Sequence, residues 1–141
     1  MAIAGEHAHP KRRLQDARFQ SPRIEYSALS ETLTVITLSG DHDLFTKYRL
    51  LEALARAREC PNLIIDLTPC SFLDSAIAGA LLRACHTNRQ PGQRAAVVVA
   101  AHGSHIDRTL ATAGLYKLVT VHTSLGRALQ SAGEHSAAGT T

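Results

Sequence analysis

The sequence predicts an α/β fold in which a mixed β-sheet opens with a β-hairpin and continues as alternating strands and helices packed against the sheet. Three observations support this fold class. Residues 63–67 and 95–101 are apolar runs rich in branched side chains, as expected for strands covered on both faces. Segments with apolar residues at helical spacing follow both runs, so helical crossovers should make these strands parallel. An earlier pair of β-rich runs makes the sheet mixed.

The opening hairpin is predicted from residues 23–29 and 33–39, which the polar tripeptide Ser30-Glu31-Thr32 separates. A helix is expected next and must end before Pro61, because proline cannot continue a helix. Its buried stripe is predicted from four residues at the spacing i, i+4, i+7 and i+11: Leu44, Tyr48, Leu51 and Ala55.

The central segment is a strand at residues 63–67, a short loop and a helix over residues 75–88. Asp74 or Ser75 is the expected N-cap, whose side-chain oxygen accepts from otherwise unpaired backbone N–H groups. The buried face of the helix is predicted from five apolar residues: Ile77, Ala80, Leu81, Ala84 and Cys85. This geometry displays the Ser75 hydroxyl at a helix start, a place that accommodates added negative charge.

The remaining elements continue the alternation. A short helix stopped by Gly114 is expected after the strand at residues 95–101. Residues 118–121 form a last strand. Ser124 then caps a final helix that is expected to end at Gly133.

Length and charge predict one domain with two tails. A chain of 141 residues is long enough for a single core. Its basic excess lies in the first 23 residues, with five Lys and Arg against two Asp and Glu, whereas the rest is balanced at ten against ten. We expect a disordered basic N-terminal arm over residues 1–22, the α/β domain over residues 23–133 and a flexible C-terminal tail over residues 134–141.

Composition argues against several classes of protein. Aromatic residues make up 4% of the chain and Trp is missing, so direct nucleic-acid binding is not expected. Three cysteines without paired spacing are typical of a reducing cytoplasm, and no run reaches the ~18 apolar residues of a membrane span. The phosphate-loop, nucleophile-elbow, zinc-protease and dinucleotide motifs are missing, so neither an enzyme nor a cofactor is predicted.

Loops and ligands gather where parallel strands end, because the carboxyl ends of such strands share one edge of the sheet. Residues 68–75, 101–104 and 122–124 should meet there, with residues 40–43 alongside. The same edge collects three histidines: His102, His105 and His122. Without a cysteine or a dedicated carboxylate at ligand spacing, these histidines predict no metal site.

Three segments in the same order resemble the STAS family, the fold of bacterial anti-sigma factor antagonists. The family signature Asp-Ser-Ser-Gly-Leu-Gly corresponds to Asp74-Ser75-Ala76-Ile77-Ala78-Gly79, with Ala76 and Ile77 replacing the second Ser and the first Gly. The family's Gly-Glu-Leu-Asp after its second strand is similar to Gly40-Asp41-His42-Asp43. Its turn from helix to strand near the C-terminus is similar to Ala113-Gly114-Leu115-Tyr116-Lys117-Leu118. The resemblance implies a STAS-like domain over residues 23–133.

The resemblance also implies a function. By this resemblance, the chain is expected to be a cytoplasmic anti-sigma factor antagonist that controls sigma-factor-dependent transcription. It is expected to be a monomer or a weak dimer. Its partners would be a serine kinase that acts as the anti-sigma factor, and a phosphatase. Ser75 matches the family's phosphorylated serine, directly after the Asp. The implied partner-binding residues are Asp43, Asp74, Ser75, Ala76, Ile77 and Gly79.

Other interpretations stay open at this point. A serine at the start of a helix is usually only a cap. The departures at Ala76 and Ile77 favour a non-phosphorylated STAS module that acts as a scaffold or as a subunit of a transport or signalling complex. A nucleotide-binding or enzymatic domain that uses the loop edge is a third alternative.

Overall fold

The computed structural model describes residues 19–99 and 102–139. Two antiparallel strands come first, β1 (Arg23–Ser30) and β2 (Leu33–His42), joined by a two-residue turn. Exposed and half-buried side chains alternate along most of β1, and Ile24 and Tyr26 pack against the core. The other elements are α2 (Lys47–Arg56), β3 (Asn62–Asp66), β4 (Cys70–Leu73), α3 (Ser75–Leu82), the π-helical segment η2 (Arg83–Thr87), β5 (Arg94–Val98), α4 (His105–Thr112), the 3₁₀ segment η3 (Leu115–Lys117), β6 (Thr120–His122) and α5 (Leu125–Gly139).

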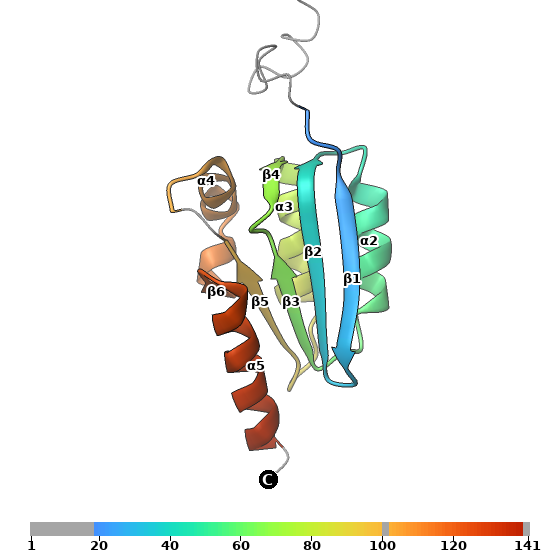
Figure 1. The fold of residues 1–141 in the computed structure, drawn as a ribbon, viewed down its shortest axis with the longest axis vertical. Helices are drawn as coiled ribbons and strands as arrows, with labels where there is room; N and C mark the ends of the chain where they lie inside the picture. Colours follow the sequence, from blue (N-terminus) through green and yellow to red (C-terminus); the bar gives the residue numbers. More distant parts are fainter. Residues whose placement is uncertain (1–18, 100–101, 140–141) are drawn as a thin grey trace, which may run out of the picture.

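The sheet has the strand order β1-β2-β3-β5-β6, and β4 pairs with β2 beyond β3. Among the described strands only the β1–β2 pair is antiparallel, whereas the other neighbours are parallel. Figure 1 shows α2 and α3 behind the sheet and α5 along its β5–β6 side, and α5 packs on the other face against Ile64 and Val98. The predicted mixed sheet, opened by a hairpin and covered by helices, is therefore confirmed.

Side chains of β3 enter cores on both faces of the sheet. Leu63 and Ile65 belong to the larger core, which the sheet forms with α2, α3 and α4. Ile64 points the other way and packs with Val98 and with Ala128 of α5. All five residues of β3 are buried, which explains why its three central residues, Leu63, Ile64 and Ile65, are all apolar.

The strand β4 was not predicted, and it decides how the candidate site is placed. After β3, the Asp66 carboxylate accepts from the backbone N–H and the hydroxyl of Thr68, at 3.0 and 2.8 Å, and so fixes a turn. The chain then returns beside the last residues of β2, where Cys70 pairs with Gly40 and Leu73 with His42. Strand β2 is therefore shared between β3 and β4.

Several predicted elements match within one or two residues, which is the usual uncertainty of element ends. The predicted strand 63–67 is observed as Asn62–Asp66, and the predicted helix 75–88 is α3 followed by η2. Gly114 ends the α4 region in the left-handed conformation with φ 81°, as expected. Strand 95–101 was predicted too long, since β5 ends at Val98, and residues 100–101 lie outside the described residues.

The predicted buried stripe of the first helix is wrong. The core face of α2 carries Leu50, Ala53 and Leu54, followed by Ala57. The predicted stripe faces solvent instead, with Leu44, Tyr48 and Leu51 exposed at 63%, 71% and 41%. Both sets satisfy helical spacing, so periodicity alone could not choose between the two faces.

The end of the last helix was also misplaced. Ser124 accepts from the backbone N–H of Arg127 at 3.2 Å, which confirms the predicted cap. However, α5 runs through Gly133 and ends at Gly139. A glycine inside a helix costs only about 1 kcal/mol relative to Ala, so Gly133 does not by itself stop one.

Candidate functional site

Ser75 is the first residue of α3 and is exposed. The residue before it, Asp74, is the N-cap, and its carboxylate accepts from the backbone N–H of Ile77 at 3.0 Å. Leu73 on one side and Ile77 on the other are fully buried, so the chain is anchored around the exposed serine. Within the described residues, the Ser75 side chain makes no hydrogen bond.

The pairing of β2 with β4 places one acidic residue directly after each of two neighbouring strands. His42 and Leu73 are opposite each other in the parallel ladder, and Asp43 and Asp74 are the next residues along each strand. The Asp43 carboxylate accepts from the backbone N–H of Phe45 at 2.9 Å and shapes the turn into α2. Sequence reasoning named both carboxylates, but the strand that aligns them is visible only in the structure.

The buried side chain of Asp41 links the neighbouring segments where β2 and β4 end. Its carboxylate accepts from the Ser71 hydroxyl at 2.9 Å and from the backbone N–H of Gln20 at 3.2 Å. The preceding Gly40 has φ 79°, and a Cβ atom there would lie 2.1 Å from the backbone oxygen of Ser21. A glycine is therefore required where the incoming chain crosses β2.

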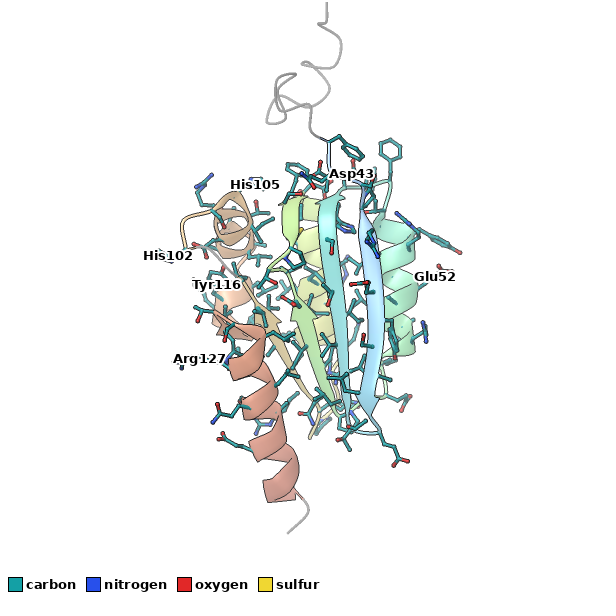
Figure 2. The ribbon with its side chains drawn as sticks, viewed as in Figure 1. Asp43, Glu52, His102, His105, Tyr116 and Arg127 are labelled. Carbon is teal, nitrogen blue, oxygen red and sulfur yellow. The ribbon has the colours of Figure 1, made fainter. Side chains whose placement is uncertain are left out.

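The helix α4 contacts the strand that leads to Ser75. The ring of His105 stacks on Phe72 with centroids 4.8 Å apart, and its Nε2 lies 3.0 Å from the backbone oxygen of Leu73. Because a carbonyl only accepts, Nε2 carries the proton in this contact. In Figure 2, Asp43 and His105 lie at the same end of the molecule, where α3 begins in Figure 1.

The start of α4 is organised by Asp107. The Asp107 carboxylate accepts from the Tyr116 hydroxyl and from the backbone N–H of Gly103, and these hydrogen bonds lower its pKa. Burial and this contact raise the pKa of Tyr116, which remains a phenol that donates to the carboxylate. Ser104 caps the helix by accepting from the Asp107 backbone N–H at 3.2 Å.

Residues 25–128 match the family model described as the STAS domain. The chain belongs to the STAS domain family. No curated protein sequence matches it.

Solved structures with this fold include an anti-sigma factor antagonist from Mycobacterium paratuberculosis, with a TM-score of 0.70 and 24% identity over 79% of this chain and 94% of that one. The anti-sigma factor antagonist SpoIIAA in its unphosphorylated form matches with a TM-score of 0.64 and 15% identity over 76% and 93% of the two chains. The Bacillus cell fate determinant SpoIIAA in the phosphorylated form matches with a TM-score of 0.58 and 14% identity over 77% and 97%. At these identities the likeness establishes the fold.

The residues implied by the STAS resemblance differ in exposure. Ser75 is exposed, and Asp43, Asp74, Ala76 and Gly79 are partly buried. Ile77 has no exposed surface, because its side chain is part of the larger core. Its contribution to any partner surface of this STAS domain is therefore to hold the first turn of α3 in place.

Sequence reasoning missed the exposed apolar surface beside this site. Phe45 is 86% exposed and directly follows Leu44 in the turn between Asp43 and α2. Tyr48 and Leu51 continue the same side of α2, so we call these four residues the α2 apolar strip. The signal was present in the sequence as a second apolar stripe on a helix that needs only one to pack.

Two of the three cysteines in the described part of the STAS domain are buried. Burial raises the pKa of the Cys70 and Cys85 thiols to about 12, which makes them poor nucleophiles. No group of three or more metal-ligating side chains occurs among the described residues. None of the helices in that part of the chain is long and apolar enough to cross a membrane.

Proposed function

We propose that this STAS domain is a cytoplasmic anti-sigma factor antagonist. It binds a serine kinase that acts as the anti-sigma factor, and phosphorylation of Ser75 weakens that binding, so that sigma-factor-dependent transcription is controlled. A phosphatase reverses the modification. The observation that carries the proposal is the exposed Ser75 hydroxyl in the first position of α3, directly after the capping Asp74. It matches the position of the phosphorylated serine in the family signature.

The local structure supports modification without unfolding. The Asp74 cap and the buried residues Leu73 and Ile77 hold the loop through contacts that do not use the Ser75 side chain. A phosphate adds about −1.5 to −2 charges and considerable bulk. Since backbone N–H groups face the N-terminus of a helix, α3 can tolerate this charge, and the fold is retained.

The surroundings of Ser75 supply both parts of a protein interface. Asp43 and Asp74 form an acidic rim, because their strands are paired at His42 and Leu73. The α2 apolar strip begins directly after Asp43 and offers large side chains for burial. Protein interfaces typically place such apolar and aromatic anchors inside a polar rim.

The phosphate would act against binding through charge. A phosphate on Ser75 would lie between a partner and the acidic rim of Asp43 and Asp74. It would concentrate negative charge where the partner must approach. A partner surface that accommodates a neutral hydroxyl then faces an uncompensated dianion. Like-charge contacts and desolvation of the phosphate both weaken the complex.

The test begins with incubating the full chain with ATP and a candidate anti-sigma serine kinase from the same organism, followed by mapping of the modified residue. We expect phosphate on Ser75, and none in Ser75→Ala. Ser71→Ala is the matched control, because Ser71 lies in the same segment but donates to Asp41. Phosphate on Ser71 alone would contradict the assignment.

Binding to the same kinase tests the surface. Ser75→Ala should bind as well as the parent protein, whereas Ser75→Asp should bind more weakly while folding equally well. Phe45→Ala should weaken binding by about tenfold or more if the α2 apolar strip is an anchor. Leu29→Ala is the control, since Leu29 is also exposed, at 56%, but lies at the far end of β1.

The second candidate is a non-phosphorylated STAS scaffold or complex subunit. It is favoured by Ala76 and Ile77, which replace the second Ser and first Gly of the family signature. Two results together would favour this candidate over phosphorylation of Ser75. The parent protein would accept no phosphate from the kinases tested, and Ser75→Asp would bind its partners as tightly as the parent does. Loss of binding in Phe45→Ala would then still identify the surface in use.

A further inference from the structure

A groove of about 540 Å³ lies at the end of the sheet opposite Ser75, where β3 and β5 begin. Its lining includes Asn62 and Arg94, the first residues of these two strands. β6 pairs with β5 only over Ala96, Val97 and Val98, so it leaves space beside the start of β5. The volume falls within the range of about 300 to 1,000 Å³ that is typical of small-molecule sites.

The groove is positively charged. Among the described residues that line it there are two arginines, Arg89 and Arg94, and two histidines, His86 and His122, but no Asp or Glu. A bound cation would therefore meet no carboxylate among these residues, whereas a bound anion would lie near the positive charge of the two arginines.

Hydrogen bonds to the backbone hold the positively charged side chain of Arg89 in place beside the groove. Its guanidinium donates to the backbone oxygens of Ala57, Arg58, Cys60 and Arg94, and no described carboxylate pairs with it. Its Nε is buried without a partner in the described structure. Burial lowers the pKa of Arg89, and the groups that oppose this shift are the Cys85 and Cys60 thiols. Carbonyl oxygens thus use all four N–H groups of its two terminal nitrogens, so Arg89 adds positive charge to the groove but no free hydrogen-bond donor there.

The wall that carries Arg89 departs from regular helix geometry. The backbone N–H of Asn88 donates to the oxygen of Arg83 at 2.8 Å, which closes the wide turn of η2. Cys85 and His86 belong to η2 and line the groove, and Arg89 follows shortly after. Such π-helical turns recur at functional sites in helices.

The other wall is apolar and made of small side chains. Ala96 of β5 and Ala128 and Ala132 of α5 line the groove on the face that α5 covers. Their short side chains leave room for an apolar body between α5 and the start of β5. Arg94 and Ala96 are two apart in β5, so their side chains project from the same face of the sheet.

We propose that this groove binds a small amphipathic anion, a carboxylate that carries an apolar body the size of a medium-length acyl chain. The carboxylate lies at the cationic rim formed by Arg94 with Arg89 behind it. The apolar body lies against Ala96, Ala128 and Ala132. The site is at the far end of the domain from Ser75, so it stands independently of the phosphorylation switch.

Amide chemical shifts of the full chain, titrated with octanoate, test the proposal, with 1-octanol as the uncharged analogue. We expect octanoate to shift the amides of Gly92, Ala96 and Ala132 and to leave that of Ser75 unchanged. Octanol should bind at least about fivefold more weakly, since it lacks the charge. Arg94→Gln should reduce octanoate affinity toward that of octanol. Arg127→Gln is the matched control, because this exposed arginine of α5 lies outside the groove lining.

Filling the groove provides a second readout. Ala132→Phe should abolish the octanoate shifts while circular dichroism and melting stay near those of the parent. If this variant is poorly folded, Ser131→Phe replaces it, since Ser131 also lines the groove and is exposed. The proposal is overturned if a folded filling variant binds octanoate normally. It is equally overturned if shifts concentrate on the α2 apolar strip, or if none appear up to about 10 mM octanoate.

Discussion

The Ser71 hydroxyl donates to the buried Asp41 carboxylate over 2.9 Å, and this hydrogen bond ties β4 to the end of β2. The same carboxylate holds the incoming chain through the backbone N–H of Gln20. One buried acid therefore joins three segments at the edge that carries Ser75. Both serines of this segment are exposed, but of the two only the Ser71 hydroxyl has a hydrogen bond to a buried group within the described structure.

Ser71→Ala is expected to destabilise the domain by about 1 to 3 kcal/mol, because a buried carboxylate loses a hydrogen-bond donor. Ser75→Ala should cost less than about 0.5 kcal/mol, as expected for an exposed side chain that makes no hydrogen bond with the described residues. Urea unfolding of both variants measures the difference. Equal stabilities would show that the Ser71–Asp41 contact contributes nothing to folding.

The two faces of α2 should respond differently to truncation. Leu54 is 7% exposed in the larger core, whereas Leu51, three residues earlier, is 41% exposed. Leu54→Ala should cost about 2 to 4 kcal/mol through lost burial and an unfilled cavity. Leu51→Ala should cost well under half of that, and thermal melting distinguishes the two. The reverse order would mean that the face predicted from sequence is the buried one.

The sequence could predict elements whose signal is local. Leu63, Ile64 and Ile65 of β3 and Val97 and Val98 of β5 are buried because both faces of the sheet are covered there, so consecutive apolar residues signal these strands. Strand β4 has only four residues and follows Pro69, and it is a strand because the end of β2 lies beside it. Such pairing depends on residues some 30 positions away, which no window of sequence contains.

In the candidate site, too, residues with a local sequence signal could be predicted, whereas those that depend on tertiary packing could not. Ser75 and its cap Asp74 could be placed from a strand, a short connection and a helix start, since all three are contiguous. The exposure of Phe45 and Tyr48 depends on which face of α2 meets the sheet, and tertiary packing makes that choice. Ile77 was predicted to bind a partner because it occupies a position of the family signature. That match did not reveal that its side chain is buried.

Asp74 allows the capping role to be separated from its charge. Asp74→Ala should cost about 1 kcal/mol, since the backbone N–H of Ile77 loses its acceptor. Asp74→Asn should keep nearly all of the stability, because Asn caps helices as well as Asp does. Chemical unfolding compares the two variants. If Asn were as destabilising as Ala, the charge of Asp74 and not its hydrogen bond would be what stabilises α3.

Buried His42 predicts a loss of stability in mild acid. Its Nε2 donates to the backbone oxygen of Ser39 at 2.9 Å, and its Nδ1 lies 3.1 Å from the Thr46 hydroxyl. Burial is the main cause that lowers the pKa of His42 below its usual value of 6.5 in the folded state.

The sign of the effect follows from this direction. In the unfolded chain His42 takes up a proton as the pH falls through about 6.5, while in the folded domain it stays neutral until a lower pH. Protonation therefore favours the unfolded state, so stability is full above that pH and declines as the pH falls toward the lower folded pKa. The free energy of unfolding in urea should be smaller at a pH of about 5.5 than at about 7.5.

His42→Asn removes the titrating group and serves as the comparison at both pH values. The variant should be less stable than the parent at the higher pH, because the buried hydrogen bonds of the imidazole are altered. It should lose less stability on acidification, since the other ionisable groups are common to both proteins. If parent and variant lose the same free energy between the two pH values, the imidazole of His42 does not titrate as its burial requires.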